Sequence, residues 1–104
     1  MSRLHQLAAI VFTDIVGYTA MMEEDEVMAV ENINRFRQTL ERSAPEHHGA
    51  IIQYYGDGCL LLFNSSVNAV LFAKLLQNDF SVSPRLPVRI GIHMGDVLLN
   101  EGNV

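Results

Sequence analysis

The sequence has few of the residues that would indicate a disulfide framework, a nucleic-acid surface or a membrane span. It has 1 cysteine, Cys59, which cannot form a disulfide within the chain. Its 7 lysines and arginines are outnumbered by 12 acidic residues, and the net charge of -5 argues against a nucleic-acid partner. Its apolar runs fall well short of the ~20 residues that cross a bilayer, so no membrane segment is expected. Because the N-terminus also has no signal-peptide pattern, we expect a cytoplasmic protein.

The sequence does contain enough apolar material for one hydrophobic core. Its 104 residues are 49% hydrophobic, and this length is typical of one domain. We find no internal repeat and no low-complexity tract. Cys59 lies within an apolar run and is expected to be a small core residue rather than a nucleophile. We therefore expect a single domain over residues 1–104.

The first half of the chain predicts a strand followed by a helix. The apolar run Leu7–Phe12 predicts a strand that is buried on both faces. From about Glu24 to Ser43, apolar residues recur at helical spacing, with acidic residues in the first turn and arginines later. Pro45 is expected to stop this helix.

The second half predicts two strands, a helix and a further strand. Two β-rich runs within Ala50–Phe63 flank Gly56-Asp57-Gly58, which is a strong hairpin signal. Asn64–Ser66 supplies N-cap candidates for the second helix. Val88–Asn100 predicts a fourth strand and the start of a fifth. The order is the ferredoxin-like βαββαβ arrangement, an α+β fold whose antiparallel sheet carries its helices on one face.

Two aspartates stand where predicted strands end or begin. Asp14 closes the first strand, and Asp57 lies in the hairpin before the third. If these strands are antiparallel neighbours, both carboxylates meet at one rim of the sheet, where a cation or a shared proton must offset their charge. Mg²⁺ or Mn²⁺ suits such ligands, and Gly17 allows the following backbone to approach phosphate closely. Taken alone, each aspartate is better explained as a plain turn or cap residue.

Three segments resemble motifs of the class III nucleotidyl cyclases, which make cyclic AMP or cyclic GMP. "FTDIVGYT" resembles the first metal motif of this family, "YYGDGCLLLF" the second, and "VRIGIHMGDV" the strand pair after the second helix. The segments occur in family order and cover essentially the whole chain. The resemblance implies an adenylate or guanylate cyclase, a phosphorus-oxygen lyase. Its expected substrate is a nucleoside triphosphate, with ATP preferred over GTP.

The resemblance also assigns roles to individual residues. It implies that Asp14 and Asp57 hold two ions of Mg²⁺ or Mn²⁺, with the backbone carbonyl of Ile15 as an added ligand. Arg89 matches a family arginine that contacts the triphosphate, although an arginine at a strand start is commonly a solvated edge residue. The backbone implied to hold the β- and γ-phosphates comprises Val16, Gly17, Tyr18 and Thr19.

The sequence departs from the family pattern in two respects. Gln53 stands where many adenylyl cyclases have lysine and guanylyl cyclases have glutamate; a neutral amide fits either base, and an outward-pointing strand residue is an equal alternative. The chain ends at Val104, before an asparagine and an arginine of the family, so we expect a truncated catalytic domain with little activity alone. The resemblance further implies a homodimer with composite active sites.

Two other functions stay open at this point. A cyclase-like domain that binds nucleotide or a partner without turnover is compatible with Gln53 and with the missing residues. A palm-type nucleotide polymerase or a diguanylate cyclase is a weaker alternative, because the acidic signature of a diguanylate cyclase is missing.

Overall fold

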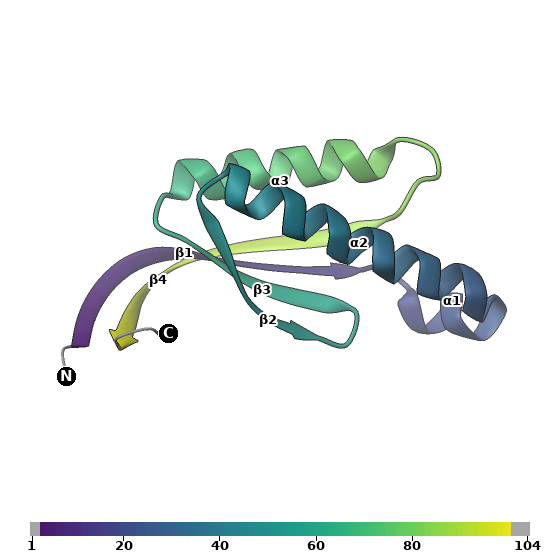
Figure 1. Ribbon diagram of the computed structural model, residues 1–104, viewed down its shortest axis with the longest axis horizontal. Coiled ribbons are helices and arrows are strands. Elements are labelled where there is room, and N and C mark those ends of the chain that lie inside the picture. Colours follow the sequence, from purple (N-terminus) through teal and green to yellow (C-terminus); the bar gives the residue numbers. More distant parts are fainter. Residues whose placement is uncertain (1–2, 101–104) are drawn as a thin grey trace.

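The computed structural model describes residues 3–100, which form three helices and four strands. Figure 1 shows their arrangement, in which the first described residue, Arg3, pairs with the last, Asn100. In chain order the elements are β1 (Arg3–Ile15), α1 (Tyr18–Glu24), α2 (Glu26–Glu46), β2 (Gly49–Tyr55), β3 (Gly58–Phe63), α3 (Ser66–Ser81) and β4 (Val88–Asn100).

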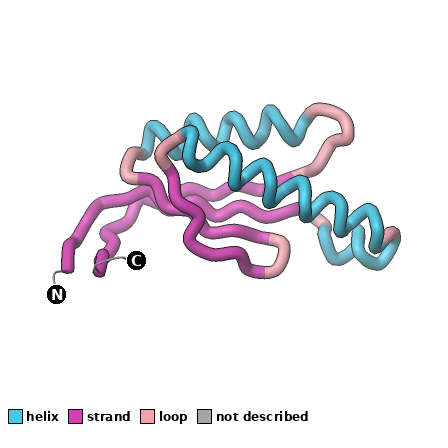
Figure 2. Tube along the Cα trace, in the orientation of Figure 1, coloured by secondary structure: helices cyan, strands magenta, loops and turns pink. Residues whose placement is uncertain are grey.

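Within residues 3–100 the strands form one antiparallel sheet in the order β2-β3-β1-β4. Helices α2 and α3 lie side by side over one face of this sheet, and α1 lies at its end, next to α2 (Figures 1 and 2). The predicted α+β, ferredoxin-like arrangement is therefore confirmed, including the position of β3 between β1 and β2.

The longest ladder in the sheet joins β1 to β4. Its register runs from Arg3 opposite Asn100 to Ile15 opposite Val88. The segment predicted to hold a fourth strand and the start of a fifth is thus one continuous strand up to its last described residue. Gly91 and Gly95 do not interrupt the strand, because pairing with β1 overrides the local preference of glycine for a turn.

The core lies between the sheet and the helices. Alternate β1 residues face it, including the fully buried Val11 and Ile15, whereas Phe12 points to the other face and is 46% exposed. The expectation that this strand is buried on both faces is therefore wrong at Phe12 and at Leu7, which is 64% exposed. Cys59 is fully buried, as expected. The largest core side chains are those of Phe36, Phe63, Phe72 and Phe80.

The helix boundaries differ from the predicted ones. Helix α1 was not predicted, and α2 continues through Pro45 to Glu46. Pro45 does not stop the helix before it, and since only Glu46 follows Pro45 in α2, almost no helix remains for the proline to disrupt. The chain turns just beyond, where the N–H groups of His47 and His48 donate to the carbonyls of Ala44 and Pro45.

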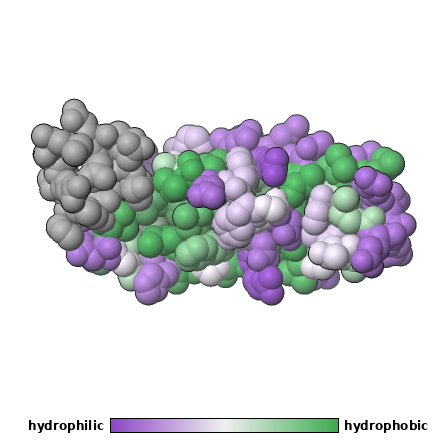
Figure 3. Space-filling view, turned by 90° about the horizontal axis from the view of Figure 1, so that it is seen from below, coloured by the Kyte–Doolittle hydropathy of each residue, from purple (hydrophilic) through white to green (hydrophobic). Residues whose placement is uncertain are grey.

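The face of the sheet opposite the helices is open. Figure 3 views the molecule from this side and shows apolar surface across the middle of the sheet, bordered by hydrophilic residues. On β1 and β3, Phe12 lies opposite Leu60, and Ile10 lies opposite Leu62. None of the helices in the described part of the chain is long and apolar enough to cross a membrane.

Candidate active site

Asp14 lies on the open face of the sheet, near the end of β1. Its register partners are Gly58 on β3 and Arg89 on β4. The next residue, Ile15, donates its N–H to the carbonyl of Asp57 at 3.2 Å. The structure therefore brings Asp57 beside Asp14, at the rim where the sequence placed both.

The hairpin that carries Asp57 needs glycine on both sides of the aspartate, at Gly56 and Gly58. Gly56 takes a φ of +54°, a left-handed conformation that glycine adopts without strain. A Cβ atom on Gly58 would come within 2.7 Å of the Tyr55 ring and 3.1 Å of the Thr13 carbonyl. The absence of a side chain at this position lets Tyr55 lie across the end of the strand pair.

Arg89 contacts Asp14 directly. Its Nε donates to Oδ1 and its Nη2 to Oδ2 of Asp14, both at 3.1 Å. These hydrogen bonds, and then the negative charges of Asp14 and Asp57, raise the pKa of the Arg89 guanidinium above its usual value. One arginine therefore faces both carboxylates, an arrangement that sequence spacing did not predict.

The backbone after Asp14 turns sharply into α1. Gly17 is the N-cap of this helix, with a φ of +73°, and its carbonyl accepts from Met21. The N–H of Val16 donates to the carbonyl of Pro87 at 2.9 Å, so this amide is engaged within the protein. The amides of the first helical turn, from Tyr18 onward, have no acceptor within the helix.

Gln53 lies on the same face of the sheet as Asp14. It pairs with Leu60, which pairs with Phe12, two residues before Asp14 on β1. Two strand spacings of about 4.8 Å separate Gln53 from Phe12. Gln53 is exposed and follows an irregularity in the β2–β3 register.

Tyr55 is a residue near the carboxylates that the sequence reasoning missed. Burial, and then the charge of Asp14, raises the pKa of its hydroxyl above the usual value of 10.0, and Asp57 contributes further. Tyr55 belongs to the segment "YYGDG", but only the register that places it beside Gly58 shows its proximity to Asp14.

The donor set fits a cation that uses few protein ligands. Asp14 and Asp57 supply two carboxylates at one rim, and Asp14 already contacts the guanidinium cation of Arg89. Within the described residues, no group of three or more His, Cys, Asp or Glu side chains could hold a metal ion. Mg²⁺ and Mn²⁺ fit this arrangement, since they complete one or two carboxylates with water and phosphate oxygens.

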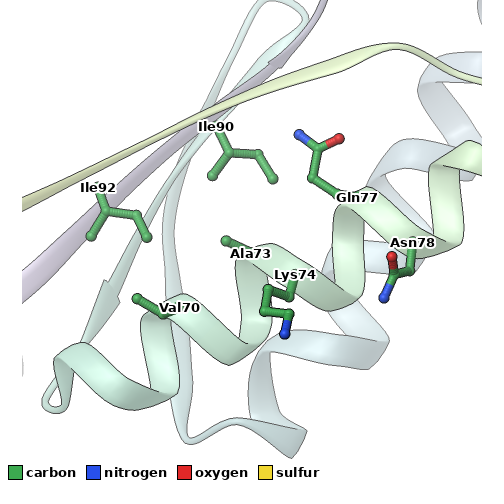
Figure 4. A pocket seen from close by; sticks show the side chains of 7 residues that line it. All are labelled: Val70, Ala73, Lys74, Gln77, Asn78, Ile90 and Ile92. Atoms are coloured by element: carbon green, nitrogen blue, oxygen red, sulfur yellow. The ribbon is translucent and has the colours of Figure 1, made fainter.

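A separate groove of about 310 Å³ lies between α3 and β4 (Figure 4). Ile90 lines it from β4, with Val70, Ala73 and Gln77 across from it on α3. Successive strand residues point to opposite faces, so Arg89 and this groove lie on opposite sides of the sheet. The groove is therefore separate from the carboxylate rim.

Comparison with known proteins identifies the family. The "Adenylate and Guanylate cyclase catalytic domain" family matches residues 1–101. A protein of Rhizobium meliloti (strain 1021), provisionally named adenylate cyclase 3, is 35% identical over 107 residues, covering 95% of this chain and 18% of that protein. An adenylate cyclase of Anabaena cylindrica is 30% identical over 106 residues, covering 86% of this chain and 21% of that protein.

A solved structure gives the same fold. The adenylyl cyclase CyaB from P. aeruginosa superposes with a TM-score of 0.84 at 19% identity, covering 96% of this chain and 61% of that one. The chain belongs to the adenylate and guanylate cyclase catalytic domain family. Domains of this family bind nucleoside triphosphates, use divalent metals and generally dimerise. The chain spans about a fifth of the length of the two curated relatives.

Proposed function

We propose that this domain supplies the metal-binding part of a nucleotidyl cyclase site, which converts a nucleoside triphosphate into its 3',5'-cyclic monophosphate. The placement of Asp14 and Asp57 at one rim supports the proposal, in a chain that belongs to the cyclase family. In this reaction the ribose 3'-oxygen loses its proton and bonds to the α-phosphorus. The bond from that phosphorus to the oxygen that bridges to the β-phosphate breaks, and pyrophosphate leaves.

Each site residue has a role in this proposal. Asp14 and Asp57 supply carboxylate oxygens, and Ile15 its carbonyl, to two ions of Mg²⁺ or Mn²⁺. Such ions, when bound, stabilise the attacking and leaving oxygens. Arg89 and the backbone amides of Gly17, Tyr18 and Thr19 bind the β- and γ-phosphates. For the Val16 amide to join them, its hydrogen bond to Pro87 must break.

ATP is the proposed substrate, because two of the relatives are named adenylate cyclases. Gln53 would contact the base, since it lies on the same sheet face as Asp14. Its amide both donates and accepts hydrogen bonds and so discriminates weakly between adenine and guanine. We therefore expect measurable turnover of GTP beside the preferred ATP.

The proposal includes a homodimer in which each copy completes the site of the other. Its support is the apolar open face that also carries Asp14 (Figure 3). We also propose a cytoplasmic location, where nucleoside triphosphates are available. For the 104-residue chain alone we expect little turnover, because the resemblance assigns ribose and transition-state contacts to residues outside it.

The test uses the complete natural protein with Mn²⁺ and either ATP or GTP. We expect cyclic nucleotide and pyrophosphate in equal amounts. Asp14→Asn and Asp57→Asn should each lower kcat by about 10²-fold or more, because each removes a charged ligand from the reacting centre. Glu23→Gln, an exposed acid on α1, is the matched control.

Two results would contradict the proposal. One is the absence of either cyclic nucleotide under all conditions, and the other is undiminished activity in both aspartate variants. Nucleotide-dependent thermal stabilisation without product would instead support a nucleotide-binding module.

A further inference from the structure

The Asp14–Arg89 contact consists of two hydrogen bonds, but its side chains are not buried enough to hold it in place. The two residues are register partners on β1 and β4, and both carboxylate oxygens of Asp14 accept from the guanidinium. The Arg89 side chain is nevertheless 72% exposed and that of Asp14 28% exposed. An exposed pair of this kind is weak and exchanges readily with other ions.

The contact occupies the atoms that a metal ion would need. A cation at Asp14 must bind Oδ1 or Oδ2, and each already accepts a hydrogen bond from Arg89. A second positive charge beside the guanidinium would also be repelled by it. Each carboxylate oxygen keeps a second lone pair, so metal binding and the Asp14–Arg89 contact compete through like charge and space at the same two oxygens.

Once released from Asp14, the Arg89 side chain is suited to bind the triphosphate, the second ligand of the proposed site. A guanidinium presents its N–H donors as a planar fork that fits carboxylate and phosphate oxygens alike. Arg89 lies at the start of β4, and the carbonyl of Pro87, two residues earlier, accepts from Val16, at the entrance to α1. Arg89 and the turn into α1, to which the proposed function assigns the phosphates, therefore lie at the same end of the sheet.

We propose that Arg89 is an exchangeable counterion, which neutralises Asp14 before metal binds and moves to the triphosphate once metal has replaced it. The inference rests on the proposed function, because it requires Asp14 to be a metal ligand. It adds a regulatory property to that site: metal binding releases the phosphate-binding side chain. By reciprocity, phosphate binding to Arg89 also favours metal at Asp14.

A purely structural role for Arg89 gives a different expectation. In that case the contact would serve to fasten β4 to β1. However, the backbone ladder between these strands already extends from Arg3–Asn100 to Ile15–Val88. Arg89→Gln should therefore leave the thermal unfolding midpoint nearly unchanged.

The first experiment measures Mn²⁺ binding to the nucleotide-free chain by electron paramagnetic resonance of free Mn²⁺. Arg89→Gln should bind Mn²⁺ about two- to fivefold more tightly than wild type, the range that an exposed ion pair accounts for. Arg89→Lys, which keeps the charge but loses the fork, should fall between. High salt should reduce the difference, because it screens the exposed pair.

The second experiment measures the affinity of the protein for a fluorescent ATP analogue at saturating Mn²⁺. Here Arg89→Gln should bind more weakly than wild type, the opposite direction to its Mn²⁺ affinity. Arg42→Gln is the matched control, since it removes one positive charge from an exposed pair with Asp79 on the helical side. Neither affinity should change in this control.

The outcomes separate the two proposals. Unchanged or weaker Mn²⁺ binding in Arg89→Gln overturns the exchange, and so does tighter Mn²⁺ binding without loss of nucleotide affinity. Asp14→Asn and Asp57→Asn test the underlying metal site: if both bind Mn²⁺ as wild type does, the proposed function fails. Loss of Mn²⁺ binding in these variants, with no effect of Arg89→Gln, overturns only the exchange.

Discussion

Cys59 shows how a single position on β3 differs chemically from its neighbours. It follows Gly58, the register partner of Asp14, but points to the opposite face and is fully buried against the helices. Burial raises the pKa of its thiol from 9.0 to about 11. The thiol therefore lies one residue from the carboxylate rim without taking part in it.

The raised pKa predicts an unreactive cysteine. Between pH 7 and 8 the thiol is neutral, and only the thiolate attacks alkylating reagents. Native protein should react with iodoacetamide far more slowly than protein in guanidinium chloride, with mass spectrometry as the measurement. The raised pKa also means that the thiol's stabilising contribution is complete below about pH 9 and declines as the pH rises toward 11. Rapid stoichiometric labelling of the native state would contradict this assignment.

Elements with strong local signals could be predicted from the sequence. The hairpin follows from Gly56-Asp57-Gly58, and the N-cap of α3 is Ser65, one of the expected candidates, whose side chain accepts from the Asn68 N–H. Helix α1 could not be predicted, since its 7 residues are too few for a periodic apolar face and none is buried. The prediction that Pro45 stops α2 was wrong because the effect of a proline depends on its distance from the end of the helix, which the sequence alone does not give.

The candidate site was predictable only as far as strand order fixes it. Antiparallel pairing of β1 and β3 was enough to place Asp14 near Asp57. The Asp14–Arg89 contact also requires the register of β4, and a shift of one residue would turn Arg89 to the other face. The single sequence has no local feature that fixes this register.

Helix α2 supports the hairpin through Arg37. Its guanidinium lies 4.8 Å from the centre of the Tyr54 ring, and its Nη2 donates to the Gly56 carbonyl at 3.4 Å. Tyr54 in turn donates to Glu41 on α2 at 3.1 Å. The turn that carries Asp57 is thus connected to a helix as well as to its own strands.

We expect Arg37→Ala to loosen this turn. Loss of the cation–π contact and of the hydrogen bond should lower the free energy of unfolding by about 1 kcal/mol. Amide hydrogen exchange should accelerate in residues 55–58 more than in β1. Arg42→Ala, five residues further along α2, is the control and should leave amide hydrogen exchange in the hairpin unchanged. Equal acceleration in both variants would show that Arg37 has no particular role in the hairpin.

At the scale of the whole molecule, the open sheet face should be an interface between two copies. In the complete protein we expect specific activity to fall on dilution, as dimers with composite sites dissociate. Phe12→Asp should move this fall to higher protein concentration, since it puts a charge on the open face of the sheet, where the apolar side chain of Phe12 is 46% exposed. Analytical ultracentrifugation of both proteins provides the measurement.

The control for this prediction is Val67→Asp, a 65% exposed apolar position at the start of α3. It should leave the dilution curve unchanged. A complete protein that stays monomeric with undiminished activity at high dilution would refute the composite site.

The β1–β4 ladder also has a consequence for folding, because it joins the first and last described strands of the chain. Pairing of β1 with β3 brings Asp14 opposite Gly58 and closes a shorter loop than the β1–β4 pairing, in which Asp14 meets Arg89 from 75 residues away. Contacts between residues so far apart in sequence are slow to form. We therefore expect the two carboxylates to come together during folding before Arg89 reaches Asp14.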